Sequence, residues 1–545
     1  MPEAREQAEP SLLTLAQSRF PEPTTAEERL FRECCKGEFI RFTNETPEEI
    51  DPGEADSWGD DRTIHAECIE WLCTDNHARQ HVHRKGIQIL GAKIEGVLHL
   101  EAIDVPFSLA LVKSSVAAGL LLHDAELRGL HLKGSYVGGI QADRLRVTGS
   151  VFLSEGFKAE GEVRLVGATI GGQLSCIKGT FLNKGGDALS CDRMQVTGSV
   201  FLRDGFKAEG EVRLVGATIG SNLECGKGTF LDKGGDALSC DGMQVTGSVF
   251  LREGFKAEGR VSLMGAHVSG GLQWHGVRDP SRTLMDLRTA KTDVLWDEVE
   301  SWPSPGNLYL DGFCYGRLSD HAPLSDKQRI AWLRLQPTSK QRGLQPWLLA
   351  GNLESFFWPQ PYEQLAKVLK AMGHERASGK VQIAKNNNYV NRGALSLPNK
   401  VGRWFLRLTT GYGYRPWRAL WIGLFLVGVG WGLFHVAGRE GIILHVEADA
   451  FSASGVQTGS SVAASQHTQP DFHPLLYAAD VFLPVITFSH TEQWAIDTKA
   501  VGYGIFGVHL SGFVLAGYQW GLNFAGWIVS ALFIAGITGA VRRRM

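Results

Sequence analysis

The chain has 545 residues, more than one ordinary domain needs, so several structural units are expected. It carries 55 basic and 58 acidic residues, a net charge of −3. This balance argues against a nucleic-acid partner, because neutralising phosphates requires a basic face. The 65 glycines outnumber the 20 prolines and indicate many tight turns rather than a disordered chain.

The N-terminal segment has no basic stretch followed by an apolar core, so no secretory signal is predicted. The soluble part is therefore expected in the cytoplasm, where the nine cysteines fit as free thiols. Four of them form two pairs 49 positions apart, Cys176 with Cys225 and Cys191 with Cys240. These four are interpreted as duplicated structural positions rather than as disulfides or metal ligands.

Residues 1–85 are expected to form a helical cap for the repetitive region that follows, because solenoids need capped ends. The stretch Thr24–Glu28 has helix-start chemistry, and the apolar positions from Trp58 to Leu72 predict a second amphipathic segment.

One candidate metal site lies in this cap, made of Cys73, His77, His81 and His83. On a continuous helix, positions 73, 77 and 81 share one face, and Cys and His are ligands that zinc accepts. The alternative is a polar cap edge with solvated imidazoles, since no Cys-x-x-Cys pair accompanies the cluster.

Residues 86–295 are repetitive at two scales. The heptapeptide VTGSVFL begins at Val147, Val196 and Val245, each 49 residues from the last. Beneath it, stepping by five residues from Val97 to Phe157 meets an apolar residue every time. Neither a helix nor a flat strand keeps such a phase, whereas a square-sectioned β-helix with five residues on each side does. A β-solenoid is therefore predicted, with an extended repetitive face that binds a protein partner or, alternatively, serves only as a spacer.

This stretch resembles the pentapeptide-repeat proteins, which implies a right-handed quadrilateral β-helix. The repeat motif of that family is recognisable only in parts, such as Ala125–Gly129, and the five-residue register shifts after Phe157. A bactofilin-like triangular solenoid is the alternative.

Residues 296–400 are predicted to close the solenoid and to form helices. An amphipathic helix is expected over Asp326–Leu335, followed by a pair over Pro361–Gly373 and Glu375–Asn388. The pair is similar to one tetratricopeptide-like unit, and its role is packing or the binding of a partner.

Residues 401–545 are predicted to form a helical membrane domain. Ala419–Ala437 and Gly521–Val541 are free of charge over 19 and 21 residues, long enough to cross a bilayer. Pro474–Phe488 is shorter and contains Asp480, so it is expected to be interfacial or re-entrant, and 501–518 could make a further partial insertion.

Basic residues flank both spans and predict the orientation. Five precede the first span, and Arg542, Arg543 and Arg544 follow the second, so both flanks are expected in the cytoplasm. The protein is then a multi-pass protein of the plasma (inner) membrane with a cytoplasmic solenoid and C-terminus. Small-residue stripes, such as Gly428 with Gly432, indicate hairpin packing or homo-oligomerisation.

Several motifs outside the repeats resemble those of bacterial multi-span pentapeptide-like proteins: Ser301–Pro303, Leu308–Phe313, Pro361–Ala366, Tyr477 with Asp480, Pro484 and Trp494, and Ala525–Gly539. Members of that family are often labelled membrane-associated oxidoreductases, and the resemblance implies that activity.

The sequence itself contains no cofactor, catalytic or phosphate-binding motif, so no catalytic or cofactor-binding residue is named. Residues 452–468 are expected to form a flexible loop. The favoured function is a non-catalytic membrane-anchored scaffold or sensor. The alternatives are a membrane-associated oxidoreductase using an unidentified cofactor, and a channel-like protein whose pathway is lined by Asp480.

Overall fold

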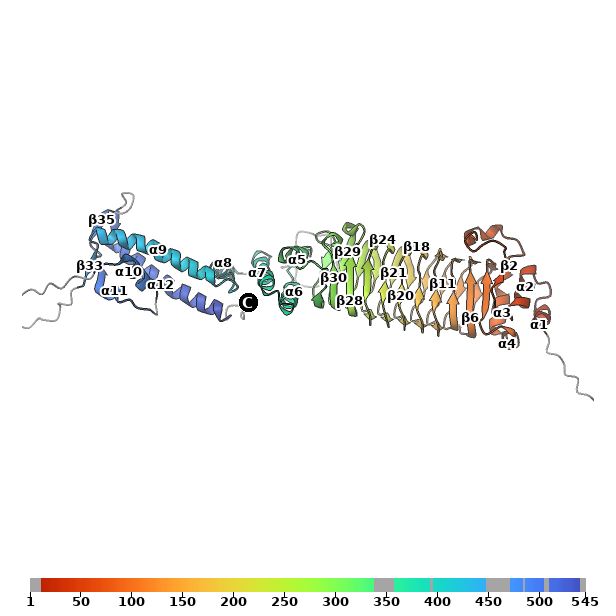
Figure 1. Ribbon diagram of the computed structural model, residues 1–545. Helices are drawn as coiled ribbons and strands as arrows, with labels where there is room; N and C mark the ends of the chain where they lie inside the picture. The colour runs from red at the N-terminus through yellow and green to blue at the C-terminus, as the bar shows by residue number, and fades with distance from the viewer. Residues whose placement is uncertain are drawn as a thin grey trace, which may run out of the picture. The chain divides into compact units, whose positions relative to one another are not determined.

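The structure is a computed structural model that describes residues 11–337, 357–392, 396–446, 471–483, 486–503 and 509–539. The chain divides into two compact units, Met1–Gln382 and Ile383–Met545 (Figure 1). The division falls inside helix α7 (Glu375–Arg392). The predicted loop over 452–468 lies outside the described residues.

The first unit is a β-solenoid of about ten turns, whose strands pair in parallel in two long sheets. In the described residues the larger sheet contains 17 strands: β1 (Ile40–Arg41), β3 (Ile87–Leu90), β6 (Asp104–Val112), β9 (Glu126–His131), β12 (Arg146–Val147), β13 (Val151–Phe152), β16 (Thr169–Ile170), β17 (Leu174–Ser175), β19 (Gln195–Val196), β20 (Val200–Phe201), β22 (Thr218–Ile219), β23 (Leu223–Glu224), β25 (Gln244–Val245), β26 (Val249–Arg252), β28 (His267–His275), β30 (Lys291–Asp297) and β32 (Cys314–Leu318).

The second sheet contains 15 strands over the same described part of the chain: β2 (Thr63–His65), β4 (Lys93–Glu95), β5 (Leu98–His99), β7 (Ser115–Val116), β8 (Leu120–Leu121), β10 (Tyr136–Val137), β11 (Ile140–Gln141), β14 (Lys158–Ala159), β15 (Val163–Arg164), β18 (Thr180–Ser190), β21 (Lys207–Arg213), β24 (Thr229–Ser239), β27 (Lys256–Ser262), β29 (Thr283–Asp286) and β31 (Leu308–Tyr309). At both ends, the strands of the two sheets extend beyond residues 86–295, the range predicted for the solenoid. The predicted β-solenoid is confirmed, while its hand and a four-sided cross-section stay predictions.

Each turn of the solenoid passes through a corner residue with left-handed backbone. These corners share φ values between 55° and 77°, and they are Ala102, Asp124, Arg144, Gly167, Arg193, Gly216, Gly242, Gly265, Thr289 and Gly312. Successive corners are 20 residues apart at the closest, from Asp124 to Arg144, and 26 at the widest, from Gly167 to Arg193. Only glycine adopts this conformation without a steric cost, so the other residues here are strained.

The corner spacing explains the 49-residue repeat. Arg193 and Gly242 lie 49 positions apart with Gly216 between them, so one repeat spans two turns. One of these turns has 23 residues and the other 26. The longer turn carries an irregularity in strand register between Leu182 and Asp187, and again between Leu231 and Asp236.

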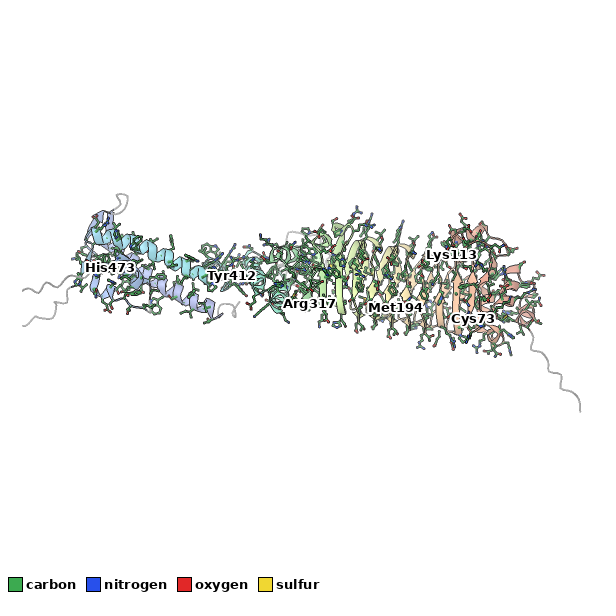
Figure 2. The ribbon with its side chains drawn as sticks, in the orientation of Figure 1. Cys73, Lys113, Met194, Arg317, Tyr412 and His473 are labelled. Carbon is green, nitrogen blue, oxygen red and sulfur yellow. The ribbon has the colours of Figure 1, made fainter. Side chains whose placement is uncertain are left out.

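A row of stacked aromatic rings runs along the solenoid core. Neighbouring ring centroids are 5.1 to 5.8 Å apart through Phe157, Phe181, Phe206, Phe230, Phe255 and Trp274. Met194, labelled in Figure 2, is fully buried in the same core. The four duplicated cysteines are also fully buried and free, as predicted, and burial raises the pKa of each thiol.

The five-residue pattern holds over only part of the solenoid. Between Leu122 and Val147 every fifth residue is buried, and this stretch includes the 20-residue turn. Before it Ala102 and Ala117 are exposed, and after it Phe152 is half-buried with its ring outside the core. The prediction fails at these positions because the other turns are longer than 20 residues. The extra residues change which positions of the five-residue pattern point into the core.

From residue 11 onward, where the structure describes it, the N-terminal cap contains four helices, α1 (Leu12–Arg19), α2 (Thr25–Glu33), α3 (Ala66–Thr74) and α4 (Ala78–His81), with a 3-10 helix η1 (Pro52–Ser57). The predicted helix start at Thr24 is confirmed as a capping box, in which Thr24 Oγ1 accepts from Glu27 N and a Glu27 oxygen accepts from Thr24 N. Phe31 of α2, Trp71 of α3 and Phe20, which follows α1, pack together with ring centroids 5.8 to 6.0 Å apart.

The other end of the solenoid is closed by 3-10 turns η2 (Pro280–Arg282) and η3 (Val299–Ser301) and by α5 (Asp326–Leu333) and α6 (Gln360–Ala371). The indole of the buried Trp274 donates to Ser301 O at 2.5 Å, and Trp302 Nε1 donates to Asp297 at 2.8 Å. Thus the Ser301–Pro303 motif packs against the last turns. The predicted helix end at Gly373 is confirmed by its φ of +83°.

The second unit contains α8 (Leu397–Thr409), α9 (Trp417–Arg439), α10 (Pro474–Phe482), α11 (His490–Gln493) and α12 (Gly512–Ile537). Two short antiparallel pairs accompany them, β33 (Ile443–His445) with β34 (Trp494–Ile496), and β35 (Val501–Tyr503) with β36 (His509–Ser511). In the region 501–518, β35 and β36 form this second pair and α12 begins at Gly512, while a partial insertion of the region into the membrane stays a prediction.

Among the described residues, α9 and α12 are the two helices long and apolar enough to cross a membrane. They pack with α10 around a cluster that includes Phe434, Tyr477 and Leu522. Close helix contact occurs at Gly423 and Gly430 of α9, where an added Cβ would meet α10 and α12 side chains at 3.0 to 3.5 Å. Gly428 and Gly432, the predicted packing pair, have open space beside them.

Candidate functional sites

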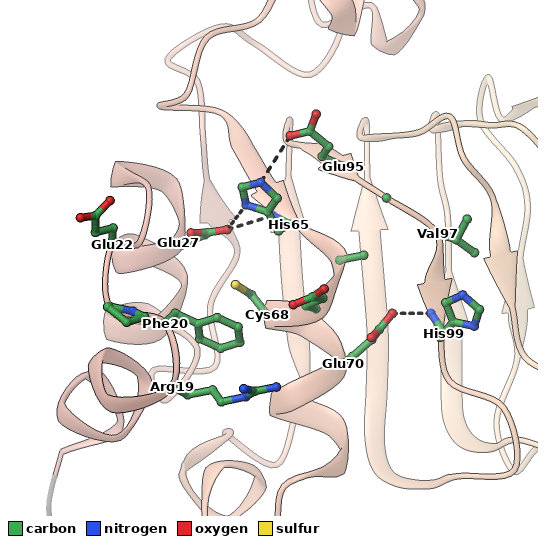
Figure 3. A pocket seen from close by; sticks show the side chains of 14 residues that line it. Arg19, Phe20, Glu22, Glu27, His65, Cys68, Glu70, Glu95, Val97 and His99 are labelled. Carbon is green, nitrogen blue, oxygen red and sulfur yellow. Dashed lines mark hydrogen bonds and ion pairs between the residues drawn. The ribbon is translucent and has the colours of Figure 1, made fainter.

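A cavity of about 840 Å³ lies between the N-terminal helices and the first turns of the solenoid (Figure 3). Its lining combines five carboxylates with one guanidinium, two imidazoles, one thiol and a few apolar residues: Arg19, Phe20, Pro21, Glu22, Glu27, His65, Ala66, Glu67, Cys68, Glu70, Glu95, Gly96, Val97 and His99. The excess of carboxylates favours a cationic occupant.

Glu27 and His65 form the central pair of this cavity. Glu27 is 3% exposed, and one of its oxygens accepts from both His65 N at 3.0 Å and His65 Nδ1 at 2.7 Å. Because a carboxylate only accepts, Nδ1 carries the proton and Nε2 points to the Glu95 carboxylate, 3.5 Å away.

The protonation of the pair follows from these contacts. The hydrogen bond to Glu27 raises the pKa of His65, and Glu95 adds to that effect. Burial opposes ionisation of Glu27, but hydrogen bonds from His65 and Thr24 outweigh it and lower the pKa of that carboxyl. His65 therefore takes up a proton more readily than an isolated histidine does, and once protonated it forms an ion pair with Glu27.

Cys68 lies beside Glu27, and burial together with that carboxylate raises the pKa of its thiol. A protonated thiol is a poor nucleophile. His65 is therefore the proton-accepting group of this cavity, and none of the described lining residues is an activated nucleophile.

The structure separates the predicted metal ligands. Helix α3 ends at Thr74 and α4 begins at Ala78, so positions 73, 77 and 81 do not share a continuous helix face. The break occurs because the Asp75 carboxylate accepts from both His77 N and Ala78 N at 2.9 Å and starts a new turn.

Burial separates the four residues further. Cys73, labelled in Figure 2, is fully buried, and burial raises the pKa of its thiol to about 12, while His77 is exposed. His81 and His83 are half-buried, and His83 Nδ1 accepts from Lys85 N at 3.2 Å. No group of three or more Cys, His, Asp or Glu in the described part of the chain is arranged to hold a metal ion. The zinc site itself stays a prediction.

A second candidate site is a column of residues on the outer face of the larger sheet, which we call the aromatic strip. Strand register places one residue per turn in line along it: His131, Phe152, Ser175, Phe201, Glu224, Phe250, Gln273 and Trp296. The four aromatic residues alternate with polar ones and are half-buried. Since neighbouring parallel strands are about 4.8 Å apart, the rings recur about every 9.6 Å.

Cationic side chains accompany these rings. Lys133 Nζ lies 4.6 Å from the centroid of the Phe152 ring, and Arg203 and Arg252 lie 5.1 and 4.6 Å from the Phe201 and Phe250 rings. At the far end, Trp296 stacks between His275 and His321 at 4.3 and 5.1 Å. The strip thus presents partly exposed aromatic rings beside arginines, residue types that are enriched at protein interfaces.

The chain matches no protein-family model, no curated protein and no solved structure at a significant level. The pentapeptide-repeat resemblance and the oxidoreductase activity that it implies therefore stay predictions.

Asp480, the polar candidate of the membrane domain, holds a loop of its own unit. Asp480 is 8% exposed, and its place at a membrane interface or along a pathway stays a prediction. Its carboxylate accepts from Phe488 N at 2.7 Å, Thr491 N at 2.9 Å and Thr491 Oγ1 at 2.8 Å. These bonds tie α10 to α11.

Proposed function

We propose that this chain is a membrane-anchored scaffold whose solenoid binds an extended protein segment along the aromatic strip. One observation carries the proposal: the strip repeats its aromatic residue on every second turn, the same period as the 49-residue duplication. A duplication that served only as a spacer would have no need to place a partly exposed phenylalanine in register on its outer face.

Anchoring is supported by where the apolar residues of α9 and α12 lie. Only 22% and 17% of the most apolar windows of these helices are buried. The core helix of a soluble protein would be mostly buried, and large side chains such as Phe425 and Trp520 are 69% and 79% exposed. A bilayer is the environment that covers them. The basic flanks favour a cytoplasmic solenoid, and the inner membrane of a bacterium is the setting that we propose.

The spacing of the strip favours one kind of partner. In a β-strand, side chains on one face recur about every 6.7 Å, which does not fit rings about 9.6 Å apart. A polyproline II segment rises about 3.1 Å per residue and returns a side chain to the same side about every 9.3 Å. Aromatic surfaces commonly recognise such segments. We therefore propose a partner with an apolar or proline residue at every third position.

Site-specific photocrosslinking in cells tests this function. A photoreactive phenylalanine analogue replaces Phe201 or Phe250 in the full chain, and the control replaces Gln195, an exposed residue on the neighbouring strand β19. The proposal predicts one discrete adduct from both strip positions, mapped to a segment with the three-residue apolar period, and none from the control. The same adducts from all three positions, or none from Phe201 and Phe250, would contradict it.

A further inference from the structure

Helix α8 presents an apolar stripe that nothing in the described structure covers. Leu397, Val401, Trp404 and Leu408 follow one another at helical spacing and are 78%, 64%, 58% and 55% exposed, with Phe405 beside them at 41%. Because these positions share one face of the helix, they form a continuous apolar surface.

The flank of the same helix is basic. Lys400, Arg403 and Arg407 are three and four residues apart, so they line a second face beside the stripe. The surrounding sequence reinforces this charge, since no acidic residue occurs between Glu375 and Glu440. That interval contains ten bases: Arg376, Lys380, Lys385, Arg392, Lys400, Arg403, Arg407, Arg415, Arg418 and Arg439.

The turn after α8 joins it firmly to the first candidate span. Tyr412 N donates to Leu406 O at 3.1 Å, and Arg415 N donates to Thr410 O at 2.9 Å. The Tyr412 ring is fully buried, and its hydroxyl is 3.2 Å from Asn387 Oδ1. At the start of α9, Trp417 and Trp421 are 53% and 66% exposed, as is usual for aromatic residues at a membrane interface.

We propose that α8 lies in the plane of the membrane surface and docks on anionic lipid headgroups. Its apolar stripe would enter the boundary between headgroups and acyl chains, while Lys400, Arg403 and Arg407 contact the lipid phosphates. The charge of the flank and its continuity with α9 favour this occupant over a second copy of the chain. The inference rests on the proposed membrane anchor, since α9 must first bring α8 to the bilayer.

Fluorescence of the full chain in lipid nanodiscs tests this docking. With Cys35 and Cys314 changed to Ser, Trp404→Cys or the control Gln17→Cys carries an environment-sensitive NBD label. One set of discs contains phosphatidylcholine alone, and the other also contains about 30% phosphatidylglycerol. We expect the label at 404 to brighten about twofold in the anionic discs and to be quenched by nitroxide lipids, whereas the label at 17 does neither.

The basic flank and the alternative occupants are tested in the same discs. Changing Lys400, Arg403 and Arg407 to Gln, or raising the salt to about 0.5 M, should remove most of the brightening. A label at 404 as water-exposed as the label at 17 would overturn the inference. So would brightening that follows the number of chains per disc rather than the anionic lipid, because that result indicates a second copy. Failure of the chain to enter discs of either kind would instead refute the membrane anchor itself.

Discussion

Arg329 of α5 and Asp297 at the end of β30 form a bidentate ion pair at the closing end of the solenoid. The two bonds measure 2.8 and 2.6 Å, and the side chains are 0% and 3% exposed. Arg329 Nε also donates to Pro323 O at 2.7 Å, and Asp297 accepts from Trp302 Nε1. Both buried charges are therefore partnered, and this ion pair attaches α5 to the last turns of the solenoid.

Breaking this pair should destabilise the closing cap. Arg329→Met leaves the Asp297 carboxylate buried with one partner, Trp302, and should cost about 3–5 kcal/mol. Limited proteolysis of the 296–337 region measures the loss. Asp297→Asn added to Arg329→Met should recover part of it, because no unpaired charge remains. The matched control is Arg317→Met, whose pair with Asp320 is exposed, and which should change stability by less than about 1 kcal/mol. Equal losses of stability in Arg317→Met and Arg329→Met would contradict a stabilising role for the buried pair.

The left-handed corners predict two substitutions of opposite sign. Ala102→Gly should stabilise the solenoid by about 1 kcal/mol, because alanine is strained at its φ of 55°. Gly242→Ala should destabilise it by a similar amount, although an added Cβ meets no atom within 4 Å, so only backbone strain acts. Apparent melting temperatures from circular dichroism in detergent provide the comparison. Changes of the same sign in the two melting temperatures would show that backbone strain at the corners does not determine these stabilities.

The inner and outer phenylalanines of one repeat should respond differently to truncation. Phe206 is fully buried between Phe181 and Phe230, and Phe206→Ala should cost about 3–5 kcal/mol. Phe201, five residues earlier, is half-buried on the strip, so Phe201→Ala should reduce the stability much less. It should nevertheless abolish the adduct that the partner forms with a photoreactive analogue at Phe250. Thermal unfolding of both variants distinguishes them. A larger loss of stability for Phe201→Ala would mean that the strip is part of the structural core.

The His65–Glu27 pair predicts a pH-dependent cap. Because the folded pKa of His65 is raised, its contribution is fully present below the ordinary value of about 6.5 and is lost as pH rises through the folded value. The lowered pKa of Glu27 gives a contribution that is lost only under acid conditions. The measurement is the hydrogen-exchange rate of residues 12–34, expressed for each protein relative to its own rate near pH 6. As pH rises, this relative rate should increase more in the wild type than in His65→Gln. A difference that does not change with pH would contradict this role.

The two-turn repeat was visible in the sequence, but the outward ring of each repeat was not identified. The step of five residues counted Phe152 as an inward position. The alternation within Val151-Phe152-Leu153, however, buries the first and third residues and leaves the ring outside. A period-two interpretation of VTGSVFL would have found the strip, whereas its alignment across turns depends on strand register, which no local pattern supplies.

The helix limits show the same division between local and distant causes. The capping box at Thr24 and the stop at Gly373 depend on neighbouring residues, and both were predicted. The supposed continuous helix through Cys73 and His81 fails because one side chain, Asp75, competes for the backbone donors. The Glu27–His65 contact joins residues 38 positions apart, so sequence spacing gave no sign of it.

Extraction of membranes with alkaline carbonate tests the central claim, that α9 and α12 anchor the solenoid in a bilayer. The full chain is expressed in a bacterium, the membranes are collected and washed at high pH, and the pellet and supernatant are compared. The anchor predicts that the intact chain stays in the pellet, and that a chain ending at residue 410 moves to the supernatant. Release of the intact chain by carbonate would contradict the anchor.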